Sequence, residues 1–333
     1  MPANLTPQYL KAEEEFKRAS TSEEKLSCLE EMLSTIPRHK GTDKLVADIR
    51  KKIKKIKESD EKKKASAPKR INLFNVKKEG AASVALLGFP NTGKSSLLSL
   101  VTNARSPVGE YPFTTTIPIP GMMDYEDIAI QLIDLPPLSE EYIEPDMFNL
   151  MRSVDLILLV ADISQDNILD QMEFIIGKLR SVKIELVNNK DIAGAGSPRP
   201  CVTYKKTLVA ANKIDADNAP DNLAILREFY GKDFMIKEIS SSAGKNIEEL
   251  KKIIFEELNI IRVYSKPPGK DADLTKPYVL KTGSTVMDAA SLVHKEIAQN
   301  LKYAKLWGSG KYKGQMVERT HILADKDIIE LHS

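Results

Sequence analysis

Eight residues in the first third of the chain, Gly88 to Ser95, read G-F-P-N-T-G-K-S and follow the short apolar run Val84–Leu87. A buried strand, a loop bounded by glycines and a helix that opens with Lys-Ser is the pattern of a phosphate-binding P-loop. The glycines let backbone N–H groups turn toward phosphate oxygens, and the helix N-terminus adds its positive dipole end. The pattern predicts a nucleoside triphosphate site in which Lys94 contacts the outer phosphates and the Ser95 hydroxyl a magnesium ion. A glycine turn before a chance Lys-Ser is the alternative.

A second motif indicates the base. Thr207–Ala211 has the composition of a buried strand, and Asn212-Lys213-Ile214-Asp215 follows it directly. The Asp215 carboxylate can accept hydrogen bonds from the guanine N1–H and N2 amine, which adenine does not offer. Asn212 and the stem of Lys213 would brace the loop and cover the base. A site built to make these two hydrogen bonds rejects a base that cannot form them by about 10⁴-fold or more. Alone, the string also fits a polar turn, but downstream of a P-loop it predicts guanine.

The composition favours an intracellular protein. The 333 residues carry a net charge of +2, with 29% of them charged, which gives no global nucleic-acid signature. The length allows two or three domains. The N-terminus lacks the pattern of a signal peptide, and the longest apolar run, Leu156–Ala161, is too short to span a bilayer. Cys28 and Cys201 have no paired spacing and the four histidines are scattered, so we expect reduced thiols and a cytoplasmic protein without a membrane partner.

The first 70 residues have a helical pattern. Three apolar stripes at helical spacing predict three helices between about Thr6 and Glu61, and Thr21–Glu24 supplies a capping box for the second. The third helix is strongly basic, with Arg50, Lys51, Lys52, Lys54, Lys55 and Lys57 around its apolar stripe. Its lysines either neutralise RNA phosphates, without sequence-specific readout, or are simply solvated. Residues 66–68 are expected to form a linker.

From residue 71 to 259, apolar strands alternate with helical segments, which predicts a parallel sheet wound with helices. The strands are expected at Val84–Leu87, Ile128–Ile133, Leu156–Val160, Thr207–Ala211 and Phe234–Ile239. Thr115 lies in the loop before the second strand, where a flexible segment can carry its hydroxyl to the magnesium and γ-phosphate. Asp134 ends that strand and would hold the magnesium through water. Ser240, Ser241 and Ser242 follow the last strand and would close over the base edge.

In this order the segments resemble the Obg-related GTPases, most closely their developmentally regulated GTP-binding branch. The resemblance rests on G-F-P-N-T-G-K-S, Y-P-F-T-T, D-L-P-P, N-K-I-D and I-S-S-S-A-G. Residues 258–267, 279–286, 302–304 and 306–309 are similar to that branch's TGS domain. The resemblance spans roughly residues 81–333. It implies an α/β fold, with a Ras-like P-loop GTPase domain over 71–260 and a TGS domain of β-grasp fold over 261–333, after the helical, basic region 1–70.

The resemblance also implies roles for individual residues. The phosphate loop comprises Asn91, Thr92, Gly93, Lys94, Ser95 and Ser96. Lys94, Thr115 and Asp134 serve catalysis, while Ser95, Thr115 and Asp134 hold Mg²⁺. Asn212, Lys213 and Asp215 recognise guanine, with Ser240, Ser241 and Ser242 behind the base. The family's TGS module is associated with RNA and ribosome-linked functions. The expected partners are therefore GTP or GDP, the ribosome or RNA through the TGS domain and basic helix, and a protein activator.

Three features depart from the family pattern. Pro137 stands where these proteins almost always have a glycine whose N–H donates to the γ-phosphate, and proline has no N–H. Losing one charge-assisted hydrogen bond costs about 1.5–3 kcal/mol, or about ten- to a hundredfold in GTP-over-GDP preference. Leu138 replaces the water-orienting glutamine of Ras-like proteins, which is usual among Obg relatives. Only a short stretch, residues 187–202, occupies the place of the domain that its relatives insert.

Two functional hypotheses follow. In the first, the chain is a GTP-hydrolysing switch, slow without an activator, that associates with ribosomes or RNA. In the second, it is a guanine-nucleotide-binding adaptor with little or no turnover, because Pro137 disables γ-phosphate sensing. The retained Lys94, Ser95, Thr115 and Asp134 favour the first. Asn91 is also open to two interpretations. In several GTPases resembling this one, an asparagine there helps coordinate a potassium ion that offsets developing charge; otherwise it merely braces the loop.

Overall fold

The computed structural model describes residues 6–18, 22–37, 42–66, 74–102, 117–138, 144–188 and 201–332. It forms two compact units, residues 1–72 and 73–333. Thr115 lies outside the described residues, and so do Thr21 of the predicted capping box, most of the predicted linker and most of the stretch 187–202.

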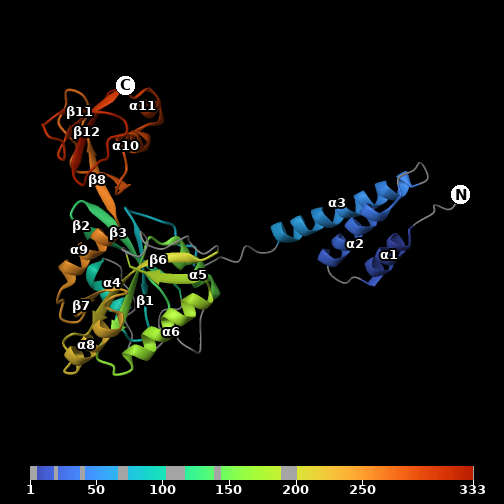
Figure 1. Ribbon diagram of the computed structural model, residues 1–333, viewed down its shortest axis with the longest axis horizontal. Helices are drawn as coiled ribbons and strands as arrows, with labels where there is room; N and C mark the ends of the chain where they lie inside the picture. Colours follow the sequence, from blue (N-terminus) through green and yellow to red (C-terminus); the bar gives the residue numbers. More distant parts are fainter. Residues whose placement is uncertain are drawn as a thin grey trace. The chain divides into compact units, whose positions relative to one another are not determined.

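The first unit contains three helices, α1 (Pro7–Arg18), α2 (Ser22–Thr35) and α3 (Asp43–Ser66), which agree with the three predicted stripes (Figure 1). Their apolar faces meet in one small core of Tyr9, Ala12, Leu29, Met32, Ile36 and Ile49. The Thr6 hydroxyl accepts a hydrogen bond from the Tyr9 N–H at 3.2 Å and donates to the Thr35 carbonyl at 3.0 Å. It thereby caps α1 and ties it to the end of α2.

The second unit contains a seven-stranded sheet in the order β2-β3-β1-β4-β6-β5, with β7 also paired to β6. The strands are β1 (Ser83–Leu87), β2 (Ile119–Tyr125), β3 (Ile128–Asp134), β4 (Leu156–Asp162), β5 (Ile184–Val187), β6 (Thr203–Asn212) and β7 (Met235–Glu238). All neighbouring strands are parallel except β2 and β3, which form an antiparallel hairpin. The carboxyl ends of β1, β3, β4 and β6 therefore lie at one edge of the sheet.

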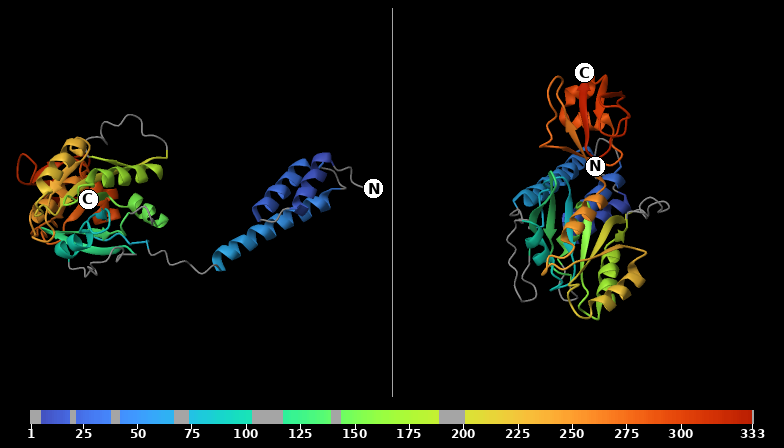
Figure 2. Two further views of the ribbon diagram at one scale, coloured as in Figure 1. Left: turned by 90° about the horizontal axis from the view of Figure 1, so that it is seen from below. Right: turned by 90° about the vertical axis from the view of Figure 1, so that its left-hand side faces the viewer.

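Helices cover both faces of this sheet (Figure 2). The core on one face includes side chains of α4 (Lys94–Val101) and α9 (Ile247–Glu257). The core on the other face includes α5 (Pro145–Ser153), α6 (Ile168–Ser181) and α8 (Ala219–Tyr230). All seven residues of β4 are buried, as expected for a strand covered on both sides. The predicted α/β fold is confirmed.

The C-terminal part forms a second, five-stranded sheet in the order β11-β10-β12-β8-β9. Its strands are β8 (Ile260–Ser265), β9 (Tyr278–Lys281), β10 (Tyr303–Trp307), β11 (Gln315–Val317) and β12 (Asp327–His332), with β8 and β12 parallel. One apolar cluster joins side chains of this sheet, including Val263 and Ile329, to Val286 and Ala289 of α10 (Val286–Val293). A helix packed on a small mixed sheet is the architecture expected of a β-grasp domain.

Two local predictions need correction. The amphipathic run from Val286 to Gln299 predicts one helix after the turn Gly283–Thr285, but the structure has α10 and a separate α11 (Lys295–Asn300). His294 between them is extended, with φ −165° and ψ 134°, and its Nδ1 atom accepts a hydrogen bond from the Glu296 N–H, which caps the second helix. The sequence also missed β2 and β5. Pro120 and Gly121 in β2 are residues that usually interrupt strands, and β5 has only four residues.

Candidate nucleotide-binding site

The P-loop joins the end of β1 to the start of α4. Gly93, the residue before the helix, has a φ of +93°, which favours glycine. A Cβ atom at Gly88 would lie 2.4 Å from the Val160 carbonyl oxygen, so the loop passes β4 too closely for a side chain. Asn91 has a φ of +61° and an exposed side chain. These positions let the loop turn tightly enough for its backbone to face a ligand at the N-terminus of α4.

Lys94 is buried beneath this loop. Its Nζ atom donates to the carbonyl oxygens of Gly88, at 3.1 Å, and Phe89, at 2.7 Å. Burial lowers the pKa of Lys94 to about 8, and the nearby Asp134 carboxylate opposes this shift. The loop therefore surrounds an amine that a phosphate group would strongly favour in its charged form.

Ser95 and Asp134 meet beside Lys94. The Ser95 hydroxyl donates to Asp134 Oδ2 at 2.5 Å, and Asp134 is fully buried at the end of β3. Its Oδ1 atom has no hydrogen-bond partner among the described residues, and burial raises the pKa of this carboxyl. A hydroxyl and a partly unsatisfied carboxylate are ligands that suit Mg²⁺, directly or through water. These two residues therefore fit the predicted magnesium site.

The segment after β3 folds back onto the P-loop. The Leu138 N–H donates to the Gly88 carbonyl oxygen at 3.2 Å, and the Leu138 side chain is completely buried in the core. Pro137 has no N–H to donate. Neither of these two positions thus offers a backbone donor to a γ-phosphate, and the Leu138 side chain does not reach toward one.

Asn212 connects the two predicted halves of the site. Its Nδ2 atom donates to the Thr92 carbonyl oxygen at 2.8 Å and to Ser241 Oγ at 3.0 Å, while its Oδ1 atom accepts from the Ser241 N–H at 2.9 Å. It is fully buried, and a Cβ atom on Gly93 would lie only 2.2 Å from Nδ2. The structure thus brings the P-loop, the Asn-Lys-Ile-Asp motif and the serine segment together.

The remaining residues predicted to recognise the base surround Asn212. Lys213 has a φ of +69°, and its Nζ atom lies 2.6 Å from Asp162 Oδ2, which fixes its stem across the loop. Asp215 is exposed, and Ser242 Oγ donates to its carboxylate at 3.3 Å. Hydrogen bonding, chiefly from Ser240, lowers the pKa of Asp215, so its carboxylate stays ionised as guanine recognition requires.

The other predicted residues lie nearby. Thr92 is buried, with its hydroxyl donating to the Phe89 carbonyl at 3.1 Å, and Ser96 is half-buried in the first turn of α4. Ser240 is buried, and its Oγ atom accepts from the Ala243 N–H at 2.9 Å. Sequence analysis missed Asp162, which holds Lys213. The sequence pattern that could have identified Asp162 is the one that identified Asp134, an aspartate at the end of a buried strand.

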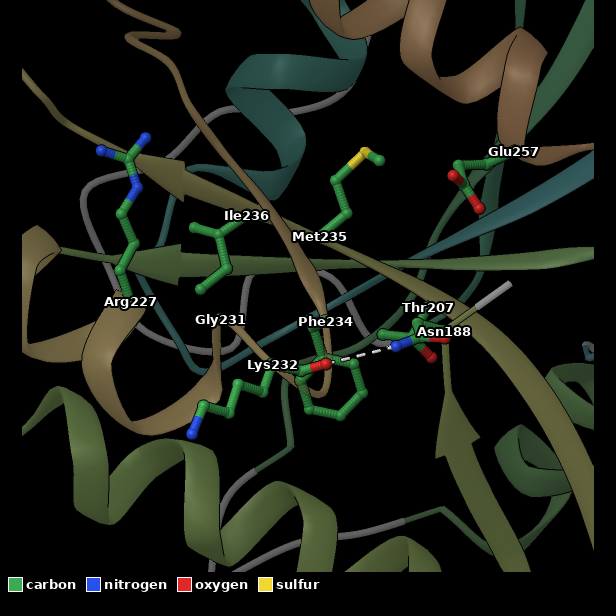
Figure 3. A pocket seen from close by; sticks show the side chains of 9 residues that line it. All are labelled: Asn188, Thr207, Arg227, Gly231, Lys232, Phe234, Met235, Ile236 and Glu257. Carbon is green, nitrogen blue, oxygen red and sulfur yellow. Dashed lines mark hydrogen bonds between the residues drawn. The ribbon is translucent and has the colours of Figure 1, made fainter. Parts of the chain in front are cut away.

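A pocket of about 620 Å³ lies elsewhere (Figure 3). Its lining includes Met235, the first residue of β7, together with Arg227, Phe234 and Glu257. None of the predicted site residues lines it. The predicted residues instead gather at the carboxyl ends of parallel strands, where ligands bind in open α/β sheets.

No helix among the described residues is both long and apolar enough to cross a membrane. They also contain no cluster of three or more histidine, cysteine or acidic side chains placed to hold a metal ion.

Two family models match the chain. Residues 83–190 match the 50S ribosome-binding GTPase family, and residues 261–333 match the TGS domain. A solved structure, that of the YchF GTPase of Schizosaccharomyces pombe, covers 77% of this chain and 99% of its own with a TM-score of 0.53 and 12% identity. That likeness shows a shared fold.

Three curated relatives align over nearly the whole chain. An uncharacterized GTP-binding protein of Methanocaldococcus jannaschii is 31% identical over 93% of this chain and 92% of its own length. Human developmentally-regulated GTP-binding protein 2 is 27% identical over 92% and 98%. Ribosome-interacting GTPase 1 of Saccharomyces cerevisiae is 25% identical over 94% and 99%.

Proposed function

Because the chain belongs to the Obg-related GTPases, in the developmentally regulated GTP-binding branch with a TGS domain, we propose that it hydrolyses GTP to GDP and phosphate as a cytoplasmic, ribosome- or RNA-associated switch. GTP binding is common to this family, so the proposal concerns hydrolysis and the association with ribosomes or RNA. One observation supports hydrolysis most directly. Lys94, Ser95 and Asp134 converge at the edge of the sheet where Asn212 joins the P-loop to the base-recognition loop.

Each of these side chains has a defined task in this mechanism. The Lys94 ammonium would exchange its two loop carbonyls for phosphate oxygens and stabilise the charge that develops as the γ-phosphate leaves. Ser95 and Asp134, together with Thr115, would hold Mg²⁺, which neutralises phosphate charge when bound. The attacking group is water, and the described site residues include no side-chain base within the loop. Positioning and electrostatics therefore carry the reaction, and we expect it to be slow without a protein activator.

A potassium ion is part of this proposal. Asn91 lies at the tip of the P-loop with an exposed side chain, so its carbonyl oxygen is free to face a hard cation next to the phosphates. A monovalent cation there would take the charge-offsetting role of an arginine. Turnover should then be faster in potassium than in sodium at equal ionic strength, and Asn91→Ala should remove that difference while GDP affinity stays nearly unchanged.

Two basic surfaces support association with RNA or the ribosome. The segment from Leu301 to Val317, which forms the β10–β11 hairpin, contains four lysines and three aromatic residues but no acidic residue. At its tip Tyr312 is 75% exposed between Lys311 and Lys313. Lysines beside exposed aromatic rings suit a nucleic-acid strand, because they pair with phosphates while the rings stack on bases. Helix α3 adds an exposed lysine cluster, the α3 cluster, made of Lys51, Lys52, Lys54 and Lys55.

The second candidate, an adaptor with little or no hydrolysis, is favoured by the loop after β3. Pro137 has no N–H, and the Leu138 N–H is already bonded to Gly88. A chain that senses the γ-phosphate poorly can still bind guanine nucleotides through the braced base-recognition loop.

Turnover of the purified full-length chain, with and without ribosomes, separates the two candidates. We expect slow phosphate release that ribosomes accelerate and that Lys94→Ala abolishes. If phosphate release in both conditions equals that of the Lys94→Ala variant, while GDP still binds the wild-type chain, the adaptor is the correct function.

A further inference from the structure

A single buried arginine links the GTPase sheet to the TGS domain. Arg262 on β8 is only 2% exposed. On its own domain, its Nε and Nη2 atoms donate to the two carboxylate oxygens of Asp325 at 3.0 and 2.6 Å. Its backbone N–H also donates to Asp325, and its carbonyl accepts from the Lys326 N–H at 2.8 Å. A bidentate pair of this kind fixes the guanidinium in one orientation.

The other side of the same guanidinium contacts the GTPase sheet. Its Nη1 atom donates to Asp127 Oδ1 at 2.8 Å and also to the Glu126 carboxylate. These two acids form the turn between β2 and β3. Two further contacts join the domains at this point: the Tyr264 hydroxyl donates to Asp127, and Lys326 Nζ lies 2.9 Å from Glu126. We call these five residues and Asp325 the hairpin clamp, comprising Glu126, Asp127, Arg262, Tyr264, Asp325 and Lys326.

An aromatic pair supports the clamp. The Arg262 guanidinium lies over the Phe255 ring of α9, 4.8 Å from its centroid, and Phe255 stacks on Tyr125 of β2 with ring centroids 5.0 Å apart. Close by, a cleft of about 530 Å³ lies between residues 127–129 of the GTPase sheet and residues 275–279 of the TGS domain. The clamp therefore lies beside an open cleft between the two domains.

The contact ties the hairpin turn to the TGS domain. If the hairpin turn moved away on its own, Arg262 would keep Asp325 but lose the Asp127 and Glu126 acceptors of its Nη1 atom. Hydrogen bonds between charged groups are among the strong ones. The position of the hairpin turn and the strength of the TGS contact therefore depend on each other.

The far end of the hairpin reaches the nucleotide site. In the register of β2 and β3, Tyr125 faces Ile128 at the turn and Ile119 faces Asp134 at the opposite end. Seven residues of strand span roughly 20 Å. Asp134 is the carboxylate that Ser95 contacts, and Thr115 precedes Ile119 by four residues in the sequence. The hairpin is thus a stiff connection between the predicted magnesium ligands and Arg262.

We propose that Arg262 is a positioning residue of the nucleotide site, because it fixes the β2–β3 hairpin to the TGS domain and makes the two sites bias each other. The proposal rests on the proposed function as a guanine-nucleotide switch. A nucleotide that displaces the hairpin would change the equilibrium constant of the TGS contact by some factor. By thermodynamic linkage, formation of the TGS contact then changes the affinity for that nucleotide by the same factor. Couplings of this kind typically amount to about 5- to 150-fold.

The test uses the full-length chain and a variant that cuts only the contact between the domains. Glu126→Gln with Asp127→Asn removes both hairpin charges and leaves the Arg262–Asp325 pair intact. The matched control is Glu248→Gln with Glu249→Gln, two adjacent acids on α9 that each pair with a lysine away from the clamp. Arg262→Met is a second variant, whose folding is first checked by thermal unfolding.

Two quantities are measured: the ratio of affinities for a non-hydrolysable GTP analogue and GDP, and amide hydrogen exchange at residues 260–265 and 324–328. We expect the affinity ratio to shift at least fivefold in the double variant and less than twofold in the control. In the wild-type chain, exchange at the clamp should differ between the two nucleotides, and the double variant should lose this difference.

A purely structural contact predicts other results. If the affinity ratio stays within twofold in the double variant and in folded Arg262→Met, Arg262 does not act on the nucleotide site. A failure of the proposed hydrolysis can be told apart from a failure of this coupling. In that case phosphate release would stay at the background rate, while the affinity ratio would still shift between the variants.

Discussion

Asn212→Ala is the substitution for which the structure makes the sharpest prediction. The fully buried Asn212 amide makes three hydrogen bonds that join the Thr92 carbonyl of the P-loop to the Ser241 backbone and hydroxyl of the serine segment. Alanine keeps the backbone and removes all three bonds. The phosphate-binding and base-binding loops would then no longer be fixed to each other.

The size of the effect follows from these bonds. Each contributes about 0.5–1.5 kcal/mol to stability, so we expect the free energy of unfolding to fall by about 1.5–4.5 kcal/mol. A nucleotide that bridges the two loops would have to restore their alignment on binding. If about 1.4–2.8 kcal/mol of this loss appears in binding, GDP affinity falls about ten- to a hundredfold.

Asn222→Ala is the matched control. Asn222 is also buried, and its Nδ2 atom donates to the Ile163 carbonyl at 3.0 Å and to two further acceptors in the loop after β4. It should lose comparable stability in urea unfolding but keep GDP affinity within about threefold in a fluorescent-nucleotide titration, because it joins no two parts of the site. If Asn212→Ala keeps GDP affinity as well as Asn222→Ala does, the bridge is a folding element and the reasoning is wrong.

Four further predictions concern other parts of the molecule. Asp215→Asn should shift preference from guanosine toward xanthosine nucleotides, since an amide can donate to the xanthine carbonyl, and unchanged GTP affinity in competition binding would exclude base recognition by Asp215. Pro137→Gly should raise the affinity of a non-hydrolysable GTP analogue relative to GDP by about ten- to a hundredfold through the restored N–H, whereas a constant ratio would show that the loop makes another contact. Replacing the α3 cluster by glutamine should weaken ribosome or RNA co-sedimentation and flatten its salt dependence, and identical salt titrations would mean that these lysines are only solvated. Burial lowers the pKa of Lys94 to about 8, whereas contact with phosphate favours its charged form, so GDP binding at pH 9 should take up protons, measured by calorimetry in two buffers of different ionisation enthalpy, and no uptake would contradict the role of this amine.

The sheet and much of the site could be predicted because the relevant signals are local. The P-loop, Asp134 and Asn212 each follow a short apolar run that had to be a buried strand. Carboxyl ends of parallel strands meet at one edge, so the order of motifs along the chain already implied that they converge. The prediction that Asn212 braces its loop followed from the chemistry of its side chain, and the structure supplies the partners.

The parts that could not be predicted depend on distant partners. Arg262 looks like an ordinary charged residue in a strand, because its acceptors Asp325, Asp127 and Glu126 lie 63, 135 and 136 residues away. Strand β2 was hidden because its pairing with β3 overrides the turn tendency of Pro120 and Gly121. The break at His294 similarly depends on a side chain that caps the following helix rather than continuing the preceding one.

The two halves of the site differ in how they can respond to the nucleotide. The predicted base half is held together by Asn212, which joins the serine segment to the Thr92 carbonyl of the P-loop. On the phosphate side, Pro137 has no N–H and the Leu138 N–H is bonded to Gly88, so neither of these two residues offers a backbone donor to a γ-phosphate. Under the proposed function, discrimination between GTP and GDP would then depend on other contacts, among them that of the predicted magnesium ligand Thr115. Because Thr115 precedes the first residue of the hairpin by only four residues in the sequence, the proposed coupling through Arg262 gives the hairpin a route by which a γ-phosphate could be sensed. A chain of this design would be expected to signal through its TGS domain rather than through the loop after β3.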